Sequence, residues 1–152
     1  MTKVPGLCLL ILVGIHAVHG SAVDFANMIR VATGKAPRQF VGYGNFCGLG
    51  GKGEVKDKID WCCREHDRCL TEVNRGACRA LFHVGFFVLD YKWAVLDNQI
   101  VCSDLNNACS AHLCECDKEA AVCMANNDHR YDPDLKRPAL YNFIRLFSFS
   151  FK

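Results

Sequence analysis

Cysteines constrain the fold of this chain more than any other residue type, because the sequence holds eleven of them. Cys8 lies in an N-terminal segment that we expect to be removed, which leaves an even set of ten. In an exported protein of one domain, an even set of cysteines indicates a disulfide framework. A structural zinc site is the weaker interpretation, because thiols oxidise outside the cell and the spacings match no zinc finger or ribbon. The ten cysteines are at positions 47, 62, 63, 69, 78, 102, 109, 114, 116 and 123.

The start of the chain predicts export. Lys3 precedes an uncharged apolar run from Leu7 to Val13, and the small residue Gly20 follows. These features form the charged region, hydrophobic region and cleavage site of a secretory signal peptide. The alternative is an uncleaved anchor, but the apolar run is shorter than the ~20 residues that span a bilayer. We therefore expect residues 1–20 to be a signal peptide, residues 21–152 to form one domain, and the protein to be secreted and extracellular.

Apolar spacing and capping residues predict a mainly α fold. Apolar residues recur at helical intervals between Ala22 and Ala32, which predicts a short helix. Two longer helices, each bounded by cap-forming residues, are expected at Lys56–Asn74 and from Asn106 or Asn107 to Asn126. Between them, two short runs in Tyr91–Val101 flank Asp97-Asn98, which predicts a small two-stranded hairpin.

Four cysteines form stripes on the two long expected helices. Cys62 and Cys69 are seven residues apart, and so are Cys116 and Cys123, so each pair lies along one face of its helix. This geometry favours two antiparallel helices joined by Cys62–Cys123 and Cys69–Cys116. Ten cysteines allow about 945 pairings, so the stripes favour these crosslinks without excluding others.

The same crosslinks would bring His66 and Asp117 together. His66 lies between the two cysteines of the first stripe, and Asp117 adjoins Cys116 on the facing helix. A carboxylate bound to one imidazole nitrogen fixes the tautomer and supports the cation that forms when the other nitrogen takes a proton. His66 is therefore a candidate general base and Asp117 its orienting partner. The alternative is a structural histidine beside a surface acid.

The glycine-rich segment Gly42–Gly53 is a candidate cation site. If Cys63 bonds Cys47, this loop is tied beside Asp67, which follows Cys63 by four residues. Such a loop can aim several backbone carbonyls at one point, and carbonyl oxygens with a carboxylate suit Ca²⁺. One alternative is a phosphate cradle, but the loop lacks the Gly-Lys-Ser/Thr ending and the strand context of a P-loop. The other alternative is that Asp67 is a solvated acidic residue on the helix surface.

At these residues the chain resembles the secretory phospholipases A2. The resemblance rests on Tyr43-Gly44 through Gly53, on Asp60 to Asp67, on Cys114-Glu115-Cys116-Asp117 and on the cysteine intervals from 102 to 123. It implies a mainly α, disulfide-stapled fold with two long antiparallel helices, a short N-terminal helix, a calcium-binding loop and a small β-wing hairpin. The implied disulfides are Cys47–Cys63, Cys62–Cys123, Cys69–Cys116, Cys78–Cys109 and Cys102–Cys114.

The resemblance also implies a secreted, calcium-dependent enzyme of lipid degradation, of the kind that releases arachidonic acid. It would hydrolyse the sn-2 ester of glycerophospholipids to a free fatty acid and a lysophospholipid. His66 would activate a water, while Ca²⁺ and the Gly48 N–H would stabilise the oxyanion. Asp117 and Tyr91 complete the implied catalytic set. The implied calcium ligands are the carbonyls of Phe46, Gly48 and Gly50 and the carboxylate of Asp67, and the implied acyl channel contains Ala22, Phe25 and Ile29.

The chain departs from the family pattern at several positions. Leu70 replaces a tyrosine that usually binds the orienting carboxylate, and the loss of this donor is expected to weaken the network by about 0.5–1.5 kcal/mol. Asn45 and Arg68 stand where extra cysteines often occur, and the tail contains no cysteine, so we expect no disulfide to staple the C-terminus back. The alternative to an enzyme is a non-catalytic or weakly catalytic binding, toxin or matrix protein. Such relatives usually lack the histidine or the aspartate, and this chain keeps both.

Two segments are unusual for the family. The apolar insertion at 79–90 would either extend a membrane-docking surface or pack against the hairpin or another subunit. The tail is atypical from about residue 132, and its aromatic and basic stretch at 139–152 is expected to pack against the body. A formal net charge of +2 at pH 7 indicates no particular anionic partner. The expected partner is the surface of a phospholipid membrane or micelle, bound peripherally, with no nucleic acid; the oligomeric state stays open.

Overall fold

The structure is a computed structural model that describes residues 20–79 and 89–138. The expected signal peptide falls almost wholly in residues 1–19, outside the described residues. The middle of the apolar insertion, residues 80–88, and the aromatic tail, residues 139–152, also lie outside them.

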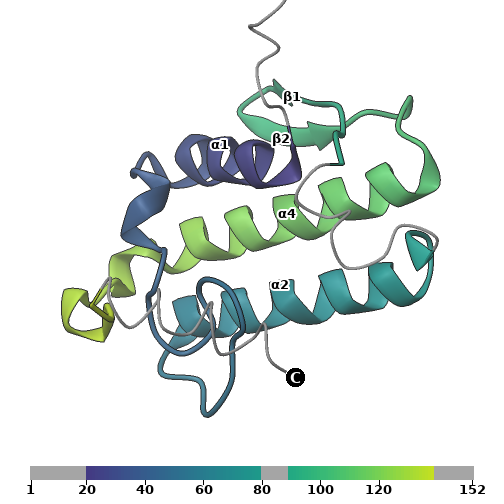
Figure 1. Ribbon diagram of the computed structural model, residues 1–152. Helices are drawn as coiled ribbons and strands as arrows, with labels where there is room; N and C mark the ends of the chain where they lie inside the picture. Colours follow the sequence, from purple (N-terminus) through teal and green to yellow (C-terminus); the bar gives the residue numbers. More distant parts are fainter. Residues whose placement is uncertain (1–19, 80–88, 139–152) are drawn as a thin grey trace, which may run out of the picture.

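Three helices form the body of the domain. The helices α2 (Lys58–Arg75) and α4 (Ala108–Asn127) run antiparallel, and α4 packs against both α2 and α1 (Ser21–Thr33) (Figure 1). This confirms the predicted mainly α fold. The observed helix ends differ from the predicted ones by one or two residues, which is the usual scatter at fraying ends.

Polar side chains fix where the two long helices begin. Asp57 caps α2, because its Oδ1 accepts a hydrogen bond from the Asp60 N–H at 2.8 Å. Asn107 caps α4 by accepting from the Ser110 N–H at 2.9 Å. Each cap satisfies a backbone donor that has no partner inside the helix. These caps set where the two cysteine-bearing helices begin.

The predicted hairpin is present between the long helices. Its strands β1 (Trp93–Leu96) and β2 (Gln99–Cys102) pair antiparallel, with Leu96 opposite Gln99. Asp97 and Asn98 between them both have positive φ, as a two-residue type I′ turn requires. The Trp93 Nε1 donates to Asp24 Oδ1 at 3.0 Å, which joins the hairpin to α1. Short 3₁₀ helices span η1 (Pro37–Gln39), η3 (Asp128–Arg130) and η4 (Pro133–Leu135).

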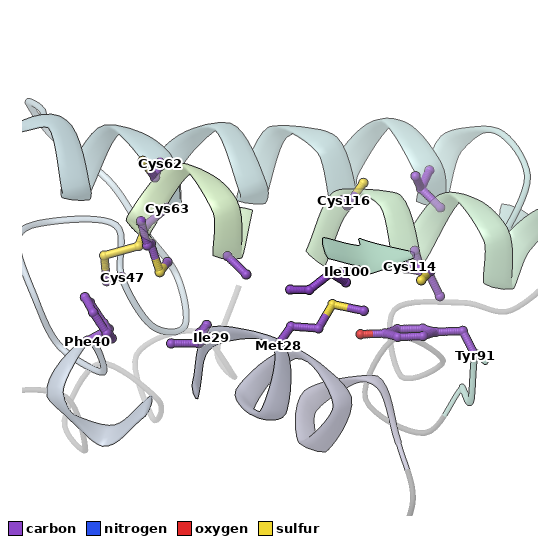
Figure 2. Packing of buried hydrophobic residues seen from close by; sticks show 14 of the residues in the cluster. Met28, Ile29, Phe40, Cys47, Cys62, Cys63, Tyr91, Ile100, Cys114 and Cys116 are labelled. Carbon is purple, nitrogen blue, oxygen red and sulfur yellow. A yellow bond between two sulfur atoms is a disulfide. The ribbon is translucent and has the colours of Figure 1, made fainter. Parts of the chain in front are cut away.

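Five disulfides cross the core, and their partners are the five pairs implied by the resemblance. Figure 2 shows Met28 and Ile29 of α1, together with Tyr91, packed among the cysteine-bearing elements. The two crosslinks between α2 and α4 lie seven residues apart on each helix, so they fix the register of one helix against the other. In the part of the chain that the structure describes, no helix is both long and apolar enough to cross a membrane.

Candidate active site

His66 on α2 and Asp117 on α4 face each other between the two interhelical disulfides. The His66 Nε2 lies 2.5 Å from Asp117 Oδ1, and the two side chains are 12% and 4% exposed. Because a carboxylate only accepts hydrogen bonds, Nε2 carries the hydrogen and Nδ1 is the nitrogen available to accept a proton. The pair therefore has the geometry of an oriented base.

Tyr91 holds the other oxygen of the same carboxylate. Its hydroxyl donates to Asp117 Oδ2 at 2.5 Å. Burial of the phenol, reinforced by the charge of Asp117, raises the pKa of Tyr91 well above its ordinary range, so the hydroxyl stays a donor. Leu70, where the family usually has a second tyrosine, lines the cavity beside this network instead. With both oxygens engaged, Asp117 is fixed in orientation relative to His66.

An apolar cavity of about 380 Å³ opens at this pair. Phe25 of α1 stacks on the His66 ring with 4.3 Å between centroids and 25° between planes. The structure places all three predicted channel residues, Ala22, Phe25 and Ile29, in the wall. Several other wall residues were not predicted, because nothing in their local sequence marks them as lining a common cavity. These are Ala26, Pro37, Phe40, Val41, Leu49 and Met124.

A buried carboxylate shapes the glycine loop. Asp60 is fully buried, and it accepts hydrogen bonds from the backbone N–H groups of Asn45, Phe46 and Lys56 at 2.7–2.9 Å. A Cβ at Gly44 would lie only 2.3 Å from the Asp60 side chain, so glycine is required there. Asp60, in the first turn of α2, thus determines the conformation of the loop.

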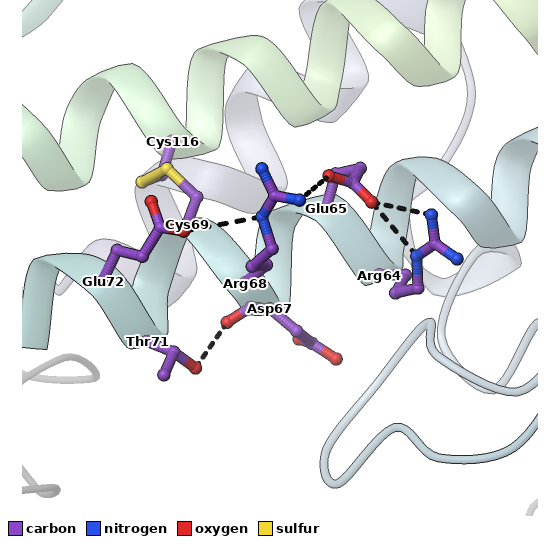
Figure 3. Close-up of polar contacts among 8 residues, drawn as sticks. All are labelled: Arg64, Glu65, Asp67, Arg68, Cys69, Thr71, Glu72 and Cys116. Carbon is purple, nitrogen blue, oxygen red and sulfur yellow. Dashed lines mark hydrogen bonds and ion pairs between the residues drawn. A yellow bond between two sulfur atoms is a disulfide. The ribbon is translucent and has the colours of Figure 1, made fainter.

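The Cys47–Cys63 disulfide ties the same loop beside Asp67. A Cβ at Gly51 would lie 2.7 Å from Asp67 Oδ2, so the loop and the carboxylate approach more closely than any other residue would allow. Figure 3 shows the Asp67 side chain pointing away from the ion pairs that Glu65 makes on another side of α2. The Asp67 carboxylate therefore faces the loop.

The structure brings together most of the predicted calcium ligands. Phe46, Gly48 and Asp67 line the same cavity as His66, whereas Gly50, which has a φ of 70°, is not part of this lining. Backbone carbonyls with one carboxylate are hard oxygen donors, which suit Ca²⁺. Within residues 20–79 and 89–138, no group of three or more acidic, histidine or cysteine side chains is arranged so that it could hold a metal ion, and a site built mainly from backbone carbonyls needs no such group. The residues present fit calcium by their chemistry.

The start of the C-terminal tail is held without a disulfide. Tyr43, fully buried in the loop region, donates to Asp57 Oδ2 at 2.5 Å and accepts from the Asp132 N–H at 3.1 Å. Burial, with the nearby Asp57 carboxylate, raises the pKa of Tyr43 above its ordinary range. One phenol thus joins the loop, the cap of α2 and the tail, a link between distant segments that the sequence did not reveal.

Known proteins resemble this chain over the residues that form the site. The family model described as Phospholipase A2 matches residues 22–136. The chain is 38% identical to a membrane associated phospholipase A2 of Bos taurus, over 91% of this chain and 90% of that one. It is 39% identical to a group IID secretory phospholipase A2 of Mus musculus, over 86% and 87% of the two chains. A phospholipase A2 of Scolopendra dehaani is 37% identical, over 78% and 80%.

Proposed function

This chain belongs to the secretory phospholipase A2 family and is an enzyme of the phospholipase A2 type. We propose that it hydrolyses the sn-2 ester of glycerophospholipids, that His66 is the general base, and that the reaction requires Ca²⁺. The observation that carries the proposal is the 2.5 Å contact between His66 and Asp117 at an apolar cavity. A buried carboxylate with a histidine at this distance supports base catalysis.

The proton route uses only side chains of this chain. The His66 Nδ1 takes a proton from a water, whose oxygen attacks the sn-2 carbonyl carbon. Asp117 stabilises the imidazolium, and Tyr91 keeps that carboxylate in place. His66 then returns the proton to the departing glycerol oxygen as the ester C–O bond breaks. The products are a free fatty acid and a lysophospholipid, and no acyl-enzyme forms.

The glycine loop supplies the electrostatic part of the proposal. The Gly48 N–H donates to the negative charge that develops on the ester oxygen. The carbonyls of Phe46, Gly48 and Gly50 and the Asp67 carboxylate would hold the calcium ion. When bound, Ca²⁺ supplies positive charge that stabilises the same developing oxyanion.

The cavity and its rim support a lipid substrate. Apolar walls would receive an acyl chain and keep bulk solvent, other than the attacking water, out of the site. Val41 and Leu49 line the cavity and are also 57% and 53% exposed, so apolar surface continues from the cavity to the outside. Such exposed apolar side chains favour contact with a phospholipid membrane or micelle. We propose that the protein is secreted by means of residues 1–20 and acts peripherally at such surfaces.

Fatty acid release from phosphatidylcholine and phosphatidylglycerol vesicles tests this function. Wild type should release fatty acid with calcium and not with a chelator, and His66→Gln should lower the rate by about 10²–10⁴-fold. His112→Gln, at an exposed histidine of α4, is the matched control and should keep the wild-type rate. No release by wild type from either vesicle, with lipid binding retained, would favour the non-catalytic binding protein. Equal rates for wild type and His66→Gln would remove His66 from the mechanism.

A further inference from the structure

The tail pairs with the glycine loop through its backbone. The Gly44 N–H donates to the Leu135 carbonyl at 3.0 Å, and the Arg137 N–H donates to the Gly42 carbonyl at 2.9 Å. Tyr43 and Lys136 form an isolated antiparallel bridge between these bonds. The tail therefore extends the loop by a short stretch of sheet-like pairing, which places the Arg137 side chain at the base of the loop.

The Arg137 guanidinium lies among carbonyls of the loop. Its Nε donates to the Gly42 oxygen at 3.2 Å, and its Nη2 lies 3.5 Å from the Cys47 oxygen. The Gly42 N–H donates to the same Cys47 oxygen at 2.8 Å. The contact at 3.5 Å is long for a hydrogen bond, but it sets a permanent positive charge beside that oxygen. Arg137 thus binds the Gly42 carbonyl, the Gly42 N–H in turn binds the Cys47 carbonyl, and the Arg137 charge lies beside that same oxygen.

The Cys47 carbonyl and the Gly48 N–H belong to one peptide unit. Peptide bonds among the described residues are all trans, and in a planar trans unit the C=O and the N–H point in opposite directions. Fixing the Cys47 oxygen therefore fixes the direction of the Gly48 N–H. Positive charge and a hydrogen bond at the carbonyl also polarise the amide, which makes its N–H a stronger donor.

We propose that Arg137 is a positioning residue that orients and polarises the Cys47–Gly48 peptide, so that the Gly48 N–H is presented to the oxyanion. This inference rests on the proposed function, because the role of Gly48 belongs to it. Arg137 is not among the residues that line the cavity. It acts from the tail, about ninety residues further along the chain than the peptide that it holds.

The test compares Arg137→Ala and Arg137→Lys with the matched control Lys136→Ala. The Lys136 Nζ donates to the carbonyls of Arg38 and Gln39, so its removal loosens the same tail without touching the Cys47 peptide. Three quantities are measured: kcat on a monodisperse short-chain phospholipid, the affinity for a phosphonate analogue, and the affinity for an amide analogue. The phosphonate carries the oxyanion charge, whereas the amide carbonyl is neutral.

Arg137→Ala should lower kcat and the phosphonate affinity by about tenfold each. The amide affinity should change less than about twofold, because the lost interaction acts mainly in the transition state. Arg137→Lys, which keeps the charge, should lose less. Lys136→Ala should stay within about twofold of wild type in all three quantities. In the calcium-free protein, the Gly48 amide resonance should shift upfield in Arg137→Ala and not in Lys136→Ala.

Equal losses of phosphonate and amide affinity would make Arg137 a merely structural residue, and an unchanged Gly48 resonance would also overturn the proposal. If Arg137→Ala does not fold, Arg137→Gln, which removes the charge and keeps an amide donor, is measured in its place by the same two readouts. If the wild type is active and Arg137→Ala binds the phosphonate as tightly as the wild type does, this inference alone is overturned. A wild type without calcium-dependent ester hydrolysis overturns the proposed function and this inference with it.

Discussion

Phe25 lies nearly flat on the ring of His66, with 4.3 Å between the two centroids. The stack joins α1, which bears the wall of the cavity, to α2, which bears the base. The ring face of His66 is thereby covered, and the edge that carries Nδ1 is the part left to meet a water. This contact makes substrate enclosure and base orientation depend on the same side chain.

Replacing Phe25 tests that dependence. Phe25→Ala removes the stack and opens the wall, so we expect the free energy of unfolding to fall by about 1–3 kcal/mol and kcat/KM to fall by about tenfold. Phe25→Leu keeps an apolar wall without the aromatic face, so it should lose less of both. Urea unfolding and fatty acid release measure the two effects. Full activity in Phe25→Ala would show that the stack is dispensable.

Calcium binding should depend on one carboxylate. Asp67→Asn replaces a charged oxygen ligand with a neutral one, so we expect calcium affinity to fall by at least about a hundredfold, or below detection. Glu65→Gln on the other side of α2 is the matched control and should bind calcium like wild type. Titration calorimetry gives both affinities, and circular dichroism checks that the disulfide core is folded. Unchanged affinity in Asp67→Asn would exclude Asp67 as a ligand.

The two buried tyrosines predict loss of stability in alkali. Burial raises the pKa of Tyr43 and of Tyr91 in the folded protein, so each phenol ionises first in the unfolded chain. Their contribution is complete below about pH 10 and declines as pH rises above it, by up to about 1.4 kcal/mol per pH unit for each phenol. Reversible urea unfolding between about pH 8 and pH 11 measures the slope.

Tyr91→Phe separates this effect from other alkaline damage. The variant lacks one of the two phenols, so its alkaline slope should be about half that of wild type. At neutral pH it should lose about 1–3 kcal/mol, because Asp117 Oδ2 loses its hydrogen-bond donor in a buried site. A slope equal to that of wild type would show that Tyr91 does not titrate in this range on unfolding.

Local patterns predicted the parts of the fold that depend on nearby residues. The stripes of Cys62 with Cys69 and of Cys116 with Cys123 favoured two crosslinks between antiparallel helices, and the observed crosslinks bring His66 and Asp117 together. Helix caps and the Asp97-Asn98 turn are equally local signals. Each of these needs only the period of a helix or the φ preference of a turn.

Contacts between distant segments were not predictable in this way. Arg137 meets the Cys47 carbonyl ninety positions away, and no periodicity or motif links the two. The expectation that the C-terminus lacks a disulfide tie holds for the described residues, but it missed the hydrogen bonds that hold the tail through Tyr43 and Arg137. Such polar contacts depend on the tertiary arrangement of the helices and disulfides, which local sequence patterns do not specify.

The most direct test of the His66–Asp117 pair is the kcat of Asp117→Asn at saturating calcium. Asparagine keeps the shape of the side chain, but it removes the charge that stabilises the imidazolium and can hold the ring in the wrong tautomer. We predict a fall in kcat of about 10³–10⁴-fold, with calcium affinity and folding unchanged. A kcat within about tenfold of wild type would contradict the claim that Asp117 orients His66 as the general base.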